Sequence, residues 1–209
     1  MKVVAEGVSK GRDGAALPLT SVSFESGTAM LVSAETAQRP SVLGLIASGR
    51  MRPDTGTVTI DDVADAGGLR DRVALVDAPD VSEPESDVTV FGVVAEELMF
   101  AGRAAHPRAT RQMIADLGFT DWRSWTIGTV PPAVRIRILT ELAVMRLDVE
   151  GVVITAPDRH GGDPEEWWGI ARDLAERGYA VLVIAGDAAR AALGTGQMTA
   201  PGTEPEVQE

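Results

Sequence analysis

The sequence predicts an α/β domain built on a parallel sheet that carries helices on both faces. Three observations lead to this fold class. Short Val-rich runs without polar residues, such as Ala29–Val32 and Val73–Val76, are typical of strands buried on both faces. Runs with apolar residues at helical spacing alternate with such strands. A helical block at about 85–147 interrupts this alternation, which predicts an inserted helical subdomain.

The individual elements follow from the same patterns. The opening third is rich in strands, because short runs of Val, Thr and Phe are separated by Gly and Asp turns. A loop and a helix closed by Gly49 follow the third strand, and the last helix of the helical block begins near Pro131. We expect strands at Lys2–Glu6, Ser21–Glu25, Thr28–Val32, Thr57–Ile60, Val73–Val76, Gly151–Thr155 and Tyr179–Ala185, and further helices at Val90–Arg103, Arg108–Leu117, Pro164–Arg177 and Asp187–Leu193.

The length of 209 residues suits one domain, which we place at 1–194. Residues 195–209 are polar, acidic and proline-bearing, so we expect a disordered tail. The two histidines lie in loops, and we expect both His106 and His160 to be exposed loop residues.

Composition also restricts location and partners. The absence of cysteine rules out a disulfide framework and a thiolate nucleophile. No apolar run approaches the roughly 18 residues that span a bilayer, and the N-terminus lacks the apolar core of a secretory signal, so we expect a cytoplasmic protein. The net charge of -12 opposes attraction to nucleic acid or anionic lipid. Any contact with a membrane should therefore run through a protein partner.

The order of the segments resembles the nucleotide-binding domain of the ATP-binding-cassette (ABC) transporter family over nearly the whole chain. LVSAETAQRPSVLGLIASGRMRPDTGTVTID (31–61) is similar to the strand, Walker A loop, helix and RPxxGxVxxD stretch of that family. Residues 128–145 stand at the place of the signature motif, residues 151–164 at that of Walker B and the D-loop, and residues 180–187 at that of the strand before the switch histidine. The resemblance implies a P-loop NTPase-like three-layer domain with an N-terminal antiparallel β part.

Bulky residues stand where the Walker A loop needs glycine. Glycines let backbone N–H groups surround phosphate oxygens, a Lys adds charge, and a Ser or Thr helps to hold Mg²⁺. The resemblance places Ser33 and Gln38 at two glycine positions and Thr36 at a third. Arg39 takes the lysine position, although its planar guanidinium is not isosteric with an ammonium group. Pro40 offers neither hydroxyl nor N–H, and we expect it to keep Arg39 out of helical backbone geometry.

The other catalytic motifs are altered as well. Thr155 and Ala156 stand where Walker B has its metal-binding Asp and its catalytic Glu, and Gly186 replaces the switch histidine. The signature position reads VPPAV (130–134), and no Gln occurs in 76–90, where the family has its sensing glutamine. We therefore expect no catalytic residue, no metal ligand and no hydrolysis.

Two hypotheses follow. The first is a degenerate, non-hydrolysing cassette-like subunit without a cofactor, whose helical insert docks on a membrane permease or a competent cassette homologue. Asp163 resembles the D-loop aspartate, and in such a subunit it would shape a dimer contact. The alternative is a weak ATPase or nucleotide-gated switch that binds ATP through Arg39 and Ser41. Another small ligand at the same helix start is a third option. The vestigial Walker A residues are Thr36, Gln38, Arg39 and Ser41.

Overall fold

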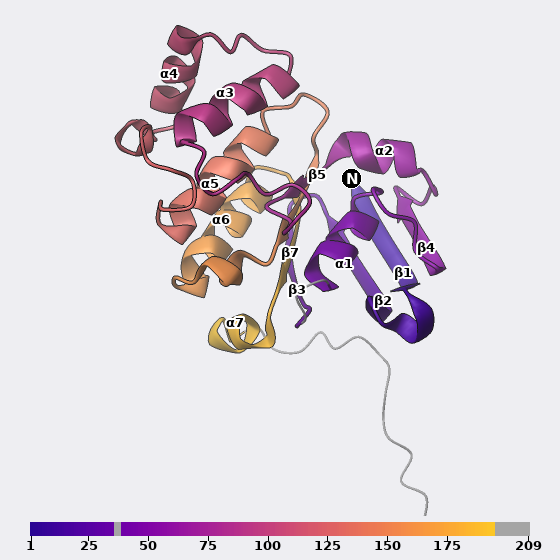
Figure 1. The fold of residues 1–209 in the computed structure, drawn as a ribbon. Coiled ribbons are helices and arrows are strands. Elements are labelled where there is room, and N and C mark those ends of the chain that lie inside the picture. The colour runs from indigo at the N-terminus through magenta and orange to yellow at the C-terminus, as the bar shows by residue number, and fades with distance from the viewer. Residues whose placement is uncertain (36–38, 195–209) are drawn as a thin grey trace, which may run out of the picture.

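A computed structural model describes residues 1–35 and 39–194, which form two sheets and the helices around them (Figure 1). The antiparallel sheet has the order β2-β1-β4, with β1 at Lys2–Lys10, β2 at Leu17–Glu25 and β4 at Thr55–Ile60. The parallel sheet has the order β3-β7-β6-β5, with β3 at Ala29–Ser33, β7 at Ala180–Ala185, β6 at Gly151–Thr155 and β5 at Val73–Val76.

The parallel sheet confirms the α/β fold class. Every residue of β5, β6 and β7 is buried, as the Val-rich runs predict for strands covered on both faces. Helix α1 (Arg39–Ala47) packs between the two sheets, and α5 (Pro132–Ala143) and α6 (Pro164–Glu176) cover the opposite face of the parallel sheet (Figure 1). The three layers are therefore the antiparallel sheet with α1, the parallel sheet, and helices α5 and α6.

Two glycines are required by close backbone packing. An ideal Cβ on Gly44 would lie 2.9 Å from Leu75 Cδ1 and 3.0 Å from Thr155 Oγ1, so glycine lets α1 approach the ends of the parallel strands. Gly56, in the RPDTG turn, has a φ of +74°, and a Cβ there would lie 2.3 Å from the Glu6 carbonyl oxygen. The similarity of this turn to the cassette pattern thus reflects backbone packing and says nothing about nucleotide chemistry.

Several boundaries differ from the sequence-based expectation. Strand β1 runs on to Lys10 and β2 begins at Leu17, because both continue past irregular register positions. Helix α2 (Ala66–Arg72) was not predicted, since its two glycines are weak helix formers. The remaining short helices are η1 (Arg12–Gly14), η2 (Thr120–Trp122), η3 (Pro157–His160) and α7 (Asp187–Ala192).

The helices between β5 and β6 have an apolar core of their own. Helices α3 (Val90–Phe100) and α4 (Pro107–Asp116) bury Val90, Val94, Leu98 and Ile114 against Ile138 and Leu142 of α5. The limits of 85–147 for this insert and of 1–194 for the domain stay predictions. The tail at 195–209 lies outside the described residues.

Candidate functional site

The segment that resembles Walker A joins β3 to α1. Thr36 and Gln38 lie outside the described residues, so their place around a phosphate stays a prediction. Helix α1 begins at Arg39, which corrects the expectation that Pro40 would exclude this residue from the helix. The restriction that a proline places on its predecessor is a preference, and here the first turn of α1 overrides it.

The structure places the first three side chains of α1, those of Arg39, Pro40 and Ser41. Pro40 is buried and has neither an N–H nor a hydroxyl group to offer. The Ser41 hydroxyl donates to the Pro79 carbonyl oxygen at 3.3 Å, and Ser41 is 8% exposed. Arg39 is half-buried, and its Nε is buried without a hydrogen-bond partner among the described residues.

Carboxylates gather where β3 ends and α7 begins. The Ser33 hydroxyl donates to the Asp187 carboxylate, and Glu35 Oε1 accepts a hydrogen bond from the Asp187 N–H. Asp158 Oδ2 accepts from the Gly186 N–H at 3.0 Å. The backbone donors that follow β7 are thus satisfied by the protein's own carboxylates. Such a cluster repels a phosphate group, since like charges a few ångströms apart oppose each other.

Of the two positions that resemble Walker B, Thr155 is buried against α1 and Ala156 is partly exposed. Thr155 ends β6 with no exposed surface, and its Oγ1 has no hydrogen-bond partner among the described residues. Ala156 follows with a φ of +47°, an uncommon value for a residue with a side chain. Neither side chain supplies a carboxylate for a metal ion or a base for water activation.

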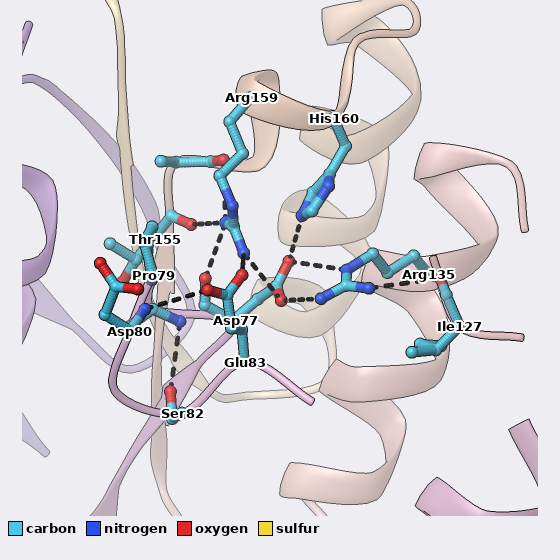
Figure 2. Close-up of polar contacts among 12 residues, drawn as sticks. Asp77, Pro79, Asp80, Ser82, Glu83, Ile127, Arg135, Thr155, Arg159 and His160 are labelled. Atoms are coloured by element: carbon cyan, nitrogen blue, oxygen red, sulfur yellow. Dashed lines mark hydrogen bonds and ion pairs between the residues drawn. The ribbon is translucent and has the colours of Figure 1, made fainter. Parts of the chain in front are cut away.

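The buried carboxylate at this edge of the parallel sheet belongs to Asp77, directly after β5 (Figure 2). Its side chain has no exposed surface and forms a bidentate pair with Arg135 of α5, with Nη2–Oδ1 at 2.7 Å and Nε–Oδ2 at 3.2 Å. His160 Nε2 lies 2.8 Å from Asp77 Oδ2. Arg135 also donates to the Ile127 carbonyl oxygen at 3.2 Å. One carboxylate therefore joins strand β5, helix α5 and the segment η3.

Arg159 lies across the ends of β5 and β6 (Figure 2). Its Nη1 donates to the backbone carbonyl oxygens of Asp77 at 2.7 Å and Thr155 at 3.0 Å. Its Nη2 lies 3.1 Å from Asp77 Oδ1 and 2.8 Å from Glu83 Oε2. The guanidinium of Arg159 thus places a positive charge of the protein itself at the ends of these two strands.

These charges are balanced within the protein. Burial by itself raises the pKa of Asp77, but hydrogen bonds from His160 and Arg135 and the charge of Arg159 outweigh it and hold that pKa well below its usual range. For Glu83, burial likewise raises the pKa, and the Asp80 N–H together with Arg159 lowers it by more. Both carboxylates stay ionised at neutral pH.

A pocket of about 600 Å³ opens beside this cluster. Arg135 and His160 reach its wall, and the loop after β5 contributes Asp80, Glu83 and Glu85. In the described part of the chain, no group of three or more His, Asp or Glu side chains is placed to hold a metal ion.

The structure also places the other residues named from the sequence. His160 is paired with Asp77, so the expectation of an exposed loop residue was wrong for it; its loop is tied down by Arg159. His106 caps α4, with Nδ1 accepting from the Ala109 N–H at 3.3 Å. Asp163 caps α6 by accepting from the Glu165 N–H at 3.0 Å.

Asp77, Arg135 and Arg159 were missed as site residues. The signal for the first was an aspartate directly after an apolar strand run, at the edge where parallel sheets carry their polar sites. Nothing in the sequence pairs this aspartate with the two arginines.

Comparison with known proteins shows the fold. Neither a protein-family model nor a curated protein sequence matches the chain. A dimeric bacterial ABC transporter cassette aligns with a TM-score of 0.63 and 16% identity, over 89% of this chain and 88% of that chain. A nucleotide-free ATP-binding cassette from an ABC transporter gives 0.61 and 16%, over 90% and 82%, and the ADP conformation of an ATP-binding cassette gives 0.60 and 15%, over 89% and 82%. The chain therefore has the fold of ABC transporter ATP-binding cassettes.

Proposed function

We propose that this protein is a non-hydrolysing, cassette-like subunit that acts through protein contacts. The observation that carries the proposal is that ion pairs of the protein itself occupy the carboxyl ends of the parallel strands. Asp77 and Glu83 are paired there with Arg135 and Arg159, so the buried carboxylate of Asp77 is not free to bind a metal ion. Thr155 and Ala156 add neither a carboxylate for a metal ion nor a base.

The electrostatics around β3 support the same proposal. Glu35, Asp158 and Asp187 place carboxylates near the start of α7, and the nearby hydroxyl of Ser33 is already bonded to one of them. A nucleotide carries several negative charges, so its phosphates would meet repulsion from these carboxylates.

The helical insert is the proposed docking surface. It exposes large apolar side chains at the end of α3, Met99 (64%) and Phe100 (69%), and beside the start of α3, Trp125 (46%). Exposed apolar side chains of this size are candidates for contact with another protein. The aligned structures come from ABC transporters, so the proposed partner is a membrane permease or a competent cassette homologue, with a dimer as the second arrangement. No described helix is both long and apolar enough to cross a membrane. We place the protein in the cytoplasm, at the inner face of the membrane through that partner.

A specific observation favours the alternative of weak ATP binding. Arg39 keeps a donor without a described partner at the start of α1, and the hydrogen bond of Ser41 is long at 3.3 Å. Both groups could turn toward an anion at the helix N-terminus.

Phosphate release from Mg·ATP by the purified protein tests the proposal. We expect no turnover above that of a sample without protein. Turnover that disappears in Arg39→Ala would overturn the proposal and support the alternative, whereas turnover that Arg39→Ala leaves intact would indicate a contaminating ATPase.

A further inference from the structure

The helical insert is attached to the parallel sheet in two ways. Helix α5 runs through both parts, since Ile136 packs with the residues of the parallel sheet while Ile138 and Leu142 pack with α3 and α4. The second attachment is polar and centres on Asp77.

Asp77 touches both sides of this boundary. Its carboxylate binds Arg135, which in turn holds the Ile127 carbonyl oxygen inside the insert. On the side of the sheet, the same carboxylate binds Arg159 and His160 of η3. Removing the carboxylate would therefore break the polar attachment of the insert to the sheet edge, while α5 and the apolar core of each part remain.

The backbone of Asp77 shows how firmly this position is held. Its φ of +57° is a left-handed conformation that aspartate adopts more readily than most residues other than glycine, and it is maintained where the surroundings determine it. The side chain is fully buried, so solvent does not compete for its hydrogen bonds.

We propose that Asp77, Arg135, Arg159 and His160 form a clamp that holds the helical insert in one orientation against the parallel sheet without any nucleotide. The docking face of the insert is then presented permanently. All of these contacts lie within the protein, so the clamp holds whether or not a nucleotide is bound.

The distance between the two parts can be measured directly, because the chain has no cysteine. Spin labels on Ser23→Cys, in β2, and Arg111→Cys, in α4, both exposed, report the position of the insert by pulsed electron resonance. We expect a single narrow distance distribution that Mg·ATP leaves unchanged, and one about twofold broader in Asp77→Asn. The matched control is Asp54→Asn, which loses an ion pair to Lys10 away from the insert.

Equal widths in Asp77→Asn and in the Asp54→Asn control would overturn the clamp, as would a broad or nucleotide-dependent distribution in the unsubstituted chain. If Asp77→Asn does not fold, Arg135→Lys carries the test, because a lysine cannot form the bidentate pair. Amide hydrogen exchange then supplies a second measurement. We expect exchange in 90–116 to rise about tenfold while β1 and β2 keep their protection. An equal rise in both parts would show general destabilisation and refute the clamp.

Discussion

Asp77→Asn tests the energetic importance of the buried cluster with little disturbance of the backbone. Asparagine has nearly the same shape and tolerates the φ of +57° at this position, so backbone strain does not confuse the result. The substitution leaves Arg135, only 5% exposed at its side chain, without its counter-charge. Breaking a buried pair in this way costs about 3–5 kcal/mol, and the retained amide oxygen favours about 3 kcal/mol. For a domain of this size the melting temperature should fall by about 6–12 °C.

Arg135→Met provides the comparison. It leaves Asp77 with Arg159 at 3.1 Å and His160 at 2.8 Å, so the carboxylate keeps two partners. We therefore expect a smaller loss of about 1–2 kcal/mol in the free energy of unfolding. Urea unfolding followed by circular dichroism measures both variants. A loss below about 1 kcal/mol in Asp77→Asn, or a larger loss in Arg135→Met, would refute the idea that Asp77 is the shared centre.

Three further predictions concern pH, the scaffold and the lost chemistry. Folding lowers the pKa of Asp77, so the stability that its ionised carboxylate contributes is complete above about pH 4 and is lost as the pH falls further. Below pH 4, the difference in unfolding free energy between the unsubstituted protein and Asp77→Asn should shrink by about 1 kcal/mol per pH unit. Urea unfolding measures this difference, and a constant value would contradict the prediction. Gly56→Ala should lower the free energy of unfolding by more than about 2 kcal/mol. Gly27→Ala, at a similar φ but with open space around it, should lower it by less, and thermal unfolding of the two variants measures the difference. Thr155→Asp with Ala156→Glu should release no phosphate from Mg·ATP, because Pro40 still lacks a hydroxyl; restored turnover would show that Walker B alone was missing.

The parallel sheet could be predicted because its signal is local. VALV in β5 and AVLVIA in β7 are apolar throughout, GVVIT in β6 is apolar up to its final threonine, and such runs are typical of strands covered on both faces. Helix α2 escaped prediction because its stability comes from Asp65, whose carboxylate accepts from the Gly67 and Gly68 N–H groups, and from packing of Leu69.

The polar site could be predicted only in part. The resemblance to the cassette pattern pointed to the positions where chemistry is missing, such as Thr155 and Ala156. It could not show what replaced that chemistry, because Asp77 and Arg135 are 58 positions apart and meet only through the packing of α5 on the sheet. Charged residues carry no periodic signal that reveals such a partner, so His160 was wrongly expected to be exposed.

Isothermal titration with Mg·ATP tests the central claim most directly. The ion pairs at the sheet edge and the carboxylates Glu35, Asp158 and Asp187 predict no heat of binding at millimolar nucleotide, for the unsubstituted protein and for Arg39→Ala alike. A micromolar dissociation constant that Arg39→Ala abolishes would contradict the account and establish Arg39 as a working nucleotide ligand.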